Sequence, residues 1–261
     1  MRKTFRAVSI AAALASQGGM AANAAPHSDK PTIVLVHGAF ADASSWNGVI
    51  ARLERDGFNV IAAANPLRGV ASDATAIAAI AQATAGPVVL VGHSYGGPVI
   101  TEAANSATNI KALVYVAGFL PERGESSSTL SVKFPGSTLG EALTPVPLPG
   151  GGQDLYIQPA KFHAQFAADL PAAEARLMAA TQRPLLQAAL AEPSGAAAWK
   201  RLPSYVVYGS ADRNIPAAVQ TFMAARAQAK KTVVLNGASH ALMISHPDKV
   251  AALIEDAAKA P

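Results

Sequence analysis

Short β-branched apolar runs alternate with longer helical patterns from Thr32 to the end of the chain. Runs typical of strands lie at residues 32–36, 59–63, 87–91, 112–117, 204–208 and 232–235. Several are apolar at every position, as parallel strands are when helices cover both faces of their sheet. Helical patterns fill the intervals, at residues 45–55, 72–85, 97–104, 216–227 and 247–259. The pattern therefore predicts an α/β fold with a mostly parallel sheet of about six strands.

The alternation stops between Leu120 and Leu202, where no clear strand is expected. Proline and glycine cluster at residues 135–152, and helical patterns follow at residues 159–170, 172–180 and 185–191. An insertion of this size between two strands predicts a helical cap of about residues 121–202. We expect it over the carboxyl edge of the sheet, where ligands bind in open α/β folds. Residues 31–261 then form one domain with the cap inserted.

The N-terminal segment has the pattern of an export signal. Arg2, Lys3 and Arg6 precede an apolar stretch at residues 7–15, and small residues follow up to Ala24. Residues 1–24 are therefore predicted to be a signal peptide cleaved near Ala24, which places the mature protein in the periplasm or outside the cell. An amphipathic or buried N-terminal helix is the alternative. The apolar stretch is too short to cross a bilayer, and no later run suggests an integral membrane protein.

Composition narrows the possible functions. With 51% hydrophobic and 15% charged residues, the chain has enough apolar material for one sizeable core. The formal charge of +4 falls to +1 once Arg2, Lys3 and Arg6 leave with the signal. No mature segment combines basic and aromatic residues as a nucleic-acid site does. The absence of cysteine excludes disulfides, thiolate catalysis and cysteine metal sites. Oligomeric state cannot be read from this pattern.

The strongest chemical motif is the segment 92–97, which reads Gly-His-Ser-Tyr-Gly-Gly. It follows the apolar run 87–91 directly and precedes a helix. G-x-S-x-G in this context marks a nucleophile elbow, a tight strand-to-helix turn that exposes a serine hydroxyl. A structural turn or a phosphate loop is the alternative reading, but no lysine follows to hold phosphate. Ser94 is therefore the candidate nucleophile.

A second motif, His37-Gly38-Ala39-Phe40, follows the first strand. A loop at this place in such folds donates one backbone N–H to an oxyanion, and the residue after the nucleophile donates another. Ala39 and Tyr95 occupy these two places, so they are the candidate oxyanion hole. Gly38 allows close approach of the backbone, and His37 is expected to be a structural, hydrogen-bonded residue.

A nucleophilic serine needs a base, which a carboxylate orients. His240 follows the last strand within Gly-Ala-Ser-His and is the candidate base. Among the other histidines, His27 adjoins the predicted cleavage site, His163 lies in the cap, and His246 precedes a helix at Pro247, where a surface or capping role is expected.

Asp212 follows the strand at residues 204–208, so the chain order Ser, Asp, His is satisfied. A helix cap ahead of Pro216 is the alternative role for Asp212. Glu122 is the fallback acid. Asp73 opens a run of alanines and is expected to be an ordinary helix cap.

These motifs resemble the α/β-hydrolase superfamily, and within it the branch of plant methyl esterases, hydroxynitrile lyases and many bacterial carboxylesterases. Besides the two motifs above, the shared features are Trp46, Phe119-Leu120-Pro121, Arg183-Pro184, residues 237–240 and Ser245-His246-Pro247. The resemblance extends from Pro31 onward and is weakest across residues 122–158. It implies an α/β-hydrolase fold and a serine esterase.

Two departures from the lyases disfavour cyanohydrin cleavage. The lyases that this branch contains carry a threonine where this chain has Gly38, and a lysine where it has Ala241. Ser94 at the nucleophile position disfavours the related dehalogenases and epoxide hydrolases, which use aspartate there. Cofactor-free perhydrolases and aromatic-ester hydrolases stay open.

The sequence therefore predicts a serine hydrolase that cleaves small or medium-sized carboxylic esters through an acyl-enzyme. Ser94, Asp212 and His240 carry the chemistry, and no metal or organic cofactor is required. A hydroxynitrile lyase-like enzyme and a non-catalytic ligand-binding homologue are the alternatives. The candidate pocket residues are Gly38 and, beneath the cap, Phe119, Tyr156, Phe162 and Phe166. Aromatic residues at helical spacing are also typical of an ordinary core.

Overall fold

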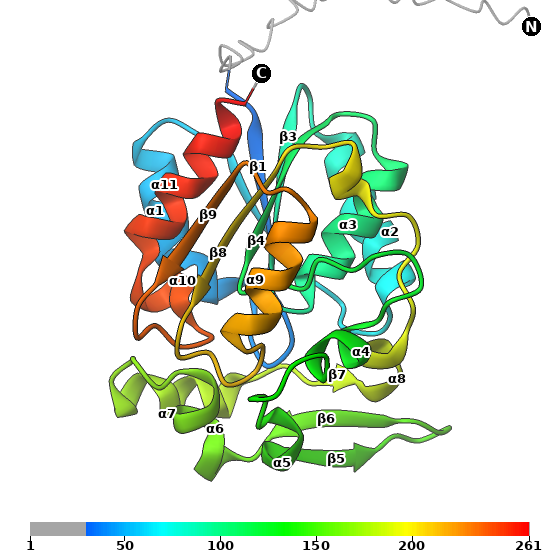
Figure 1. Ribbon diagram of the computed structural model, residues 1–261, viewed down its shortest axis with the longest axis vertical. Coiled ribbons are helices and arrows are strands. Elements are labelled where there is room, and N and C mark those ends of the chain that lie inside the picture. The colour runs from blue at the N-terminus through cyan, green and yellow to red at the C-terminus, as the bar shows by residue number, and fades with distance from the viewer. Residues whose placement is uncertain (1–29, 261) are drawn as a thin grey trace, which may run out of the picture.

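A computed structural model describes residues 30–260, and its centre is a six-stranded, wholly parallel sheet (Figure 1). The strands lie in the order β2-β1-β3-β4-β8-β9. Their bounds are β1 Thr32–Val36, β2 Val60–Ala63, β3 Val88–His93, β4 Ile110–Val116, β8 Ser204–Gly209 and β9 Lys231–Leu235. Each predicted strand is present, so the expected α/β-hydrolase sheet is confirmed. From β1 the chain adds β2 on one side and then β3 on the other, so the order of strand addition switches between β1 and β3. Open α/β sheets bind ligands at such a switch point.

Helices cover both faces of the sheet, as Figure 1 shows. One face carries the 3₁₀ turn η1 (Ala43–Trp46) and the helices α1 (Asn47–Arg55), α10 (Leu242–Ser245) and α11 (Pro247–Ala258). The other face carries α2 (Val70–Ala83), α3 (Gly96–Ser106) and α9 (Ala217–Arg226). The five helices predicted outside the cap are therefore found close to their expected bounds.

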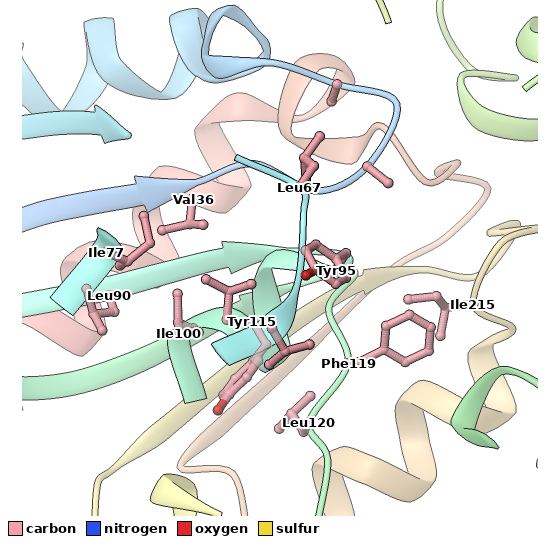
Figure 2. Packing of buried hydrophobic residues seen from close by; sticks show 14 of the residues in the cluster. Val36, Leu67, Ile77, Leu90, Tyr95, Ile100, Tyr115, Phe119, Leu120 and Ile215 are labelled. Atoms are coloured by element: carbon pink, nitrogen blue, oxygen red, sulfur yellow. The ribbon is translucent and has the colours of Figure 1, made fainter. Parts of the chain in front are cut away.

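Alternate side chains of the central strands pack into two separate hydrophobic cores, one on each face of the sheet. Val34 and Val36 of β1 pack with α2 and α3, whereas Ile33 and Leu35 pack with α1 and α11. This alternation follows from the period of two residues along a strand. Figure 2 shows the first of these cores, in which the ring of Tyr95 lies among aliphatic side chains that include Leu67. Burial on both faces explains why these strands are apolar throughout.

The cap differs from the prediction because it contains a second sheet. Its three strands are β5 (Leu143–Pro147), β6 (Gln153–Ile157) and β7 (Leu185–Leu186), paired antiparallel in that order. Pro145 and Pro147 hide β5 from a sequence pattern, because proline donates no ladder hydrogen bond. Here β5 is an edge strand, where proline is tolerated. The cluster of glycines at residues 150–152 forms the hairpin turn, and all three adopt positive φ.

Helices make up the rest of the cap. They are α4 (Ser127–Ser131), α5 (Leu139–Ala142), α6 (Pro159–Phe166), α7 (Ala172–Thr181) and α8 (Gln187–Ala191), and the 3₁₀ turn η2 (Ala198–Lys200) follows them. The helices predicted at residues 159–170 and 172–180 are found, and the one predicted at residues 185–191 begins only after the strand β7; the short helices Ser127–Ser131 and Leu139–Ala142 were not predicted. Figure 1 shows the cap at the end of the sheet toward which the strands point. Within residues 30–260, none of the helices has the length and apolar character needed to cross a membrane.

The predicted signal peptide, residues 1–24, lies outside the described residues.

Candidate active site

Ser94 occupies the turn between β3 and α3 with a φ of 53°. A non-glycine residue in this left-handed region is strained, which is characteristic of a nucleophile elbow. The flanking glycines are required by close packing. A Cβ on Gly92 would lie 2.5 Å from the carbonyl oxygen of Gly96, and a Cβ on Gly96 would lie 2.5 Å from that of Val36. The G-x-S-x-G pattern is therefore the residue choice that lets this turn close.

Backbone hydrogen bonds hold the elbow in place. The amide of Ser94 donates to the carbonyl of Val116 at 3.2 Å. The Ser94 carbonyl in turn accepts from the amides of Gly97, at 2.9 Å, and Phe119, at 3.2 Å. The nucleophile is thus fixed to the end of β4 on one side and to the first turn of α3 on the other.

His240 and Asp212 form a buried pair at the same edge of the sheet. The Nδ1 atom of His240 lies 2.7 Å from Oδ2 of Asp212, and each side chain is at most 1% exposed. Because the carboxylate only accepts, Nδ1 carries a proton, and in the neutral ring Nε2 carries the lone pair. Nε2 has no hydrogen-bond partner among the described residues. The imidazole is therefore arranged to accept a proton at Nε2.

Asp212 is itself held by backbone and by the cap. Its Oδ1 accepts from the amides of Asn214, at 2.8 Å, and Ile215, at 3.0 Å. Gln165 of α6 donates to Oδ1 of Asn214 at 2.7 Å and to the carbonyl of Arg213 at 3.0 Å. Gln165 of the cap thus holds the loop that carries Asp212. Sequence reasoning missed Gln165, because its partners lie more than forty residues away in the chain.

His93 connects the elbow to the histidine loop. Its Nε2 donates to the carbonyl of His240 at 3.1 Å, and the two rings lie 4.7 Å apart between centroids. Because His93 directly precedes Ser94, this contact brings the His240 loop alongside the nucleophile. Burial holds the pKa of His93 well below its usual value, and the neighbouring His240 lowers it further. His93 is therefore neutral, and its single proton is on Nε2.

The candidate oxyanion loop packs directly on the elbow. A Cβ on Gly38 would lie 2.7 Å from both the carbonyl oxygen of His93 and Cβ of Ser94. Ala39 follows Gly38, and Tyr95 follows Ser94 at the start of α3. Within residues 30–260, the amides of Ala39 and Tyr95 donate to no protein acceptor. Both are available to an oxyanion.

His37 is found in a structural position, as expected. Its Nε2 accepts from the amide of Asn65 at 3.1 Å, so the proton is on Nδ1, which lies 2.9 Å from the carbonyl of Gly38. Burial lowers its pKa, so the ring is neutral and holds the turn that leads to Ala39.

Aromatic side chains of the cap cover the catalytic histidine candidate. The ring of Phe166 lies edge-on to His240, with centroids 5.1 Å apart, and 5.1 Å from the ring of Phe162. Phe119 is buried, and its amide donates a hydrogen bond to the carbonyl of Ser94 in the elbow. Tyr156 of β6 lies elsewhere, on a surface hollow of about 460 Å³ with residues such as Val146 and Pro159.

Another hollow, of about 420 Å³, opens beside the oxyanion loop between η1 and α7. Phe40 forms its inner wall and also contacts Phe166, at 6.5 Å between ring centroids. The wall contains both apolar and polar side chains: Phe40, Ala41, Asp42, Ser44, Ser45, Asn47, Gly48, Glu174, Met178, Thr181, Gln182 and Ile244.

The remaining candidates lie away from the elbow. Glu122, the fallback acid, pairs with Lys200 at 2.8 Å. His163 bonds the carbonyl of Leu170 within the cap at 2.9 Å, and His246 bonds Ser245 at 2.8 Å. His27 is outside the described residues.

Asp73 differs from its expected role. Helix α2 begins at Val70, so Asp73 lies inside the first turn, fully buried, rather than at the cap. The amides of Val70 and Ala71 are instead capped by the carboxylate of Glu192 from the cap.

Parallel strands that deliver a serine elbow, a histidine and an aspartate to one carboxyl edge define the α/β-hydrolase class of fold. Comparison of the sequence agrees, because the profile of the Alpha/beta hydrolase family matches residues 33–253. The chain belongs to this family.

Individual curated relatives match only part of the chain. A carbendazim hydrolyzing esterase of Nocardioides sp. (strain SG-4G) is 33% identical over an alignment of 113 residues that covers 38% of this chain and 47% of that protein. The chain thus spans about half the length of the curated relatives it matches.

Solved structures share the fold at lower identity. Polyneuridine aldehyde esterase superposes with a TM-score of 0.75 at 19% identity, covering 87% of this chain and 98% of that one. A pyrethroid hydrolase from Sphingobium faniae JZ-2 superposes with a TM-score of 0.69 at 22% identity, covering 88% and 98%.

Proposed function

We propose that this protein is a serine hydrolase that cleaves carboxylic esters through an acyl-enzyme. The observation that carries the proposal is the buried His240–Asp212 pair, which leaves Nε2 of the imidazole unpartnered beside the strained elbow of Ser94. Such an arrangement orients a histidine to take the proton of a weak nucleophile. The names of relatives described as esterases and hydrolases support it.

The reaction begins with attack of Ser94 Oγ on the ester carbonyl while Nε2 of His240 takes the hydroxyl proton. The amides of Ala39 and Tyr95 stabilise the oxyanion, and the Asp212 carboxylate stabilises the imidazolium. His240 then returns the proton to the departing alcohol, which leaves an acyl group on Ser94. Water, deprotonated by the same nitrogen, releases the acid and restores the enzyme.

The surroundings of the histidine favour substrates with an apolar group. The buried ring of Phe166 lies against His240 and against the ring of Phe162, and Phe119 is buried beside the elbow. We therefore expect small or medium-sized esters whose acyl or alcohol part is hydrophobic. A series of nitrophenyl and alkyl esters of increasing length, assayed with the mature protein, identifies the preferred size on each side of the bond.

Replacement of Ser94 tests the assignment directly. Ser94→Ala should lower kcat by about 10⁶-fold, because the nucleophile and its base act as a unit. Ser204→Ala is the matched control, since Ser204 is also buried but begins β8 at the opposite end of the sheet. We expect this control to keep kcat within about threefold. Retained hydrolysis in Ser94→Ala contradicts the proposal.

The two alternatives are separate outcomes of the same experiment. Cleavage of mandelonitrile without ester hydrolysis indicates a lyase. The packing of Gly38 against Ser94 disfavours it, because no side chain fits there without displacing the elbow. Negligible turnover of every ester, together with ligand-induced thermal stabilisation, indicates a binding protein.

We also propose that residues 1–24 direct export to the periplasm or the medium. The support is the basic start, the apolar stretch and the small residues before Ala24. N-terminal sequencing of protein from cell fractions tests this. A mature chain that begins near Ala25 outside the cytoplasm is expected, and an intact chain confined to the cytoplasm contradicts it.

A further inference from the structure

Asp73 is a fully buried carboxylate that lies outside the catalytic machinery described above. It lies in the first turn of α2, and burial raises its pKa. An unsatisfied buried carboxylate is costly, so its partners show what the residue does. Both carboxylate oxygens accept from the amide of Arg68 at 3.1 Å, and Oδ2 accepts from the hydroxyl of Tyr95 at 3.0 Å.

Tyr95 is the residue whose amide faces the proposed oxyanion. Its side chain is almost fully buried, and its hydroxyl reaches Asp73 across 22 residues of sequence. The Tyr95 amide lies in the same peptide plane as the Ser94 carbonyl, which accepts from the amides of Gly97 and Phe119. Because the Tyr95 ring is buried, holding its hydroxyl limits displacement of the Tyr95 Cα, which is bonded to the nitrogen of that plane.

The turn that supplies Asp73 is itself held by the cap. The guanidinium of Arg68 donates to Asp154 of β6 at 2.7 Å and to the carbonyl of Pro184 at 3.0 Å. Glu192 caps the amides of Val70 and Ala71 at 2.7 and 2.9 Å. These contacts fix the position of the Asp73 carboxylate, so it is a rigid acceptor for the Tyr95 hydroxyl.

We propose that Asp73 is a positioning residue for the oxyanion hole, acting through its hydrogen bond with the Tyr95 hydroxyl. This inference rests on the proposed ester hydrolysis, since it assigns the Tyr95 amide to the oxyanion. Removing an oxyanion donor outright costs about 10²–10³ in kcat. Loosening a donor that stays in place should cost less.

Tyr95→Phe is the first test, because it deletes only the hydroxyl. We expect kcat to fall by about 10- to 100-fold with KM within about threefold, since the donor acts mainly in the transition state. A trifluoromethyl ketone analogue of the best ester provides a second readout. Ser94 adds to its carbonyl, and the resulting oxyanion occupies the proposed hole. Its affinity should fall by the same factor as kcat/KM.

Tyr115→Phe is the matched control. Tyr115 is equally buried, and its hydroxyl bonds Thr101 at 2.8 Å inside the core, without contact to the elbow amide. Its loss removes a comparable hydrogen bond and should leave kcat and ketone affinity within about twofold. A merely structural effect would lower melting temperature in both variants without separating their kinetics.

Asp73→Asn tests whether the carboxylate acts through the tyrosine. Alone it should lower kcat no more than Tyr95→Phe does, because the asparagine oxygen can still accept from the phenol. In the Tyr95→Phe background it should add less than about threefold, because coupled residues are not additive. If Asp73→Asn fails to fold, the comparison of Tyr95→Phe with Tyr115→Phe still decides the matter.

Three results would overturn the inference: unchanged kcat in Tyr95→Phe, an equal loss in Tyr115→Phe, or unchanged ketone affinity. They are distinguishable from failure of the proposed function. In that case the wild-type protein itself lacks Ser94-dependent ester hydrolysis.

Discussion

Close backbone packing at single glycines determines where the nucleophile sits. A Cβ on Gly97 would lie 2.2 Å from the carbonyl oxygen of Phe119, a fixed backbone atom that cannot rotate away. The adjacent Phe119 amide bonds the carbonyl of Ser94. A side chain at residue 97 would therefore displace the elbow as well as destabilise the folded protein.

Gly97→Ala should lower the free energy of unfolding by about 3 kcal/mol, because the backbone must shift to admit a methyl group. It should also lower kcat, since the shift moves the segment that holds Ser94. Chemical denaturation and ester kinetics measure the two effects. Gly140→Ala in α5 is the control, because Gly140 is exposed and a Cβ there meets nothing within 4 Å. Equal stability of the two variants contradicts the packing argument.

At the scale of elements, a few polar anchors join the cap to the sheet and its helices. Arg226, in the last turn of α9, donates to both oxygens of Glu125 at 2.8 Å and to the carbonyl of Leu120 at 2.7 Å. Its guanidinium also lies over the rings of Trp199 and Phe222. A paired, partly buried arginine that also stacks on aromatic rings contributes more than an exposed ion pair.

Arg226→Met should therefore lower the free energy of unfolding by about 2 kcal/mol, because it removes the cation paired with Glu125 and the donor to the Leu120 carbonyl. Lys231→Met is the control: Lys231 pairs with Asp256 at 2.7 Å, but both side chains are exposed. We expect that change to cost less than about 1 kcal/mol. Urea denaturation of the two variants gives the comparison, and a control that costs as much as Arg226→Met would refute the assigned role.

For the whole molecule, the buried neutral histidines connect stability with pH. Burial lowers the pKa of His37 and, further, that of His93. In the unfolded chain both titrate near pH 6.5. As pH falls below that value, the unfolded state takes up protons that the folded state does not, so the folded protein loses stability.

We expect the free energy of unfolding to fall by about 1–2 kcal/mol between pH 7 and pH 5.5, a range in which each such histidine contributes up to about 1.4 kcal/mol per pH unit. Urea titrations at the two pH values measure the loss. His93→Gln removes one titrating group and should reduce the loss by up to about 1 kcal/mol. A wild-type protein that is equally stable at both values would mean that these rings are not held neutral.

Local patterns predicted most of the fold, and long-range contacts account for what they missed. The six strands and the elbow follow from apolar runs and from G-x-S-x-G, which are local signals. The cap strand β5 escaped notice because Pro145 and Pro147 are acceptable only at a sheet edge. Asp73 resembled an ordinary helix cap because one of its partners, Tyr95, is distant in sequence.

The sequence by itself determined the α/β alternation, the elbow with its strained serine, and the order of the three candidate catalytic residues. These depend on backbone propensity, hydrophobic period and steric limits within a few residues. Only the tertiary structure decided that Gln165 braces the acid loop, that Glu192 caps α2, and that Asp73 holds Tyr95. Each of those contacts joins residues on separate elements, and burial at their junction makes a polar partner obligatory.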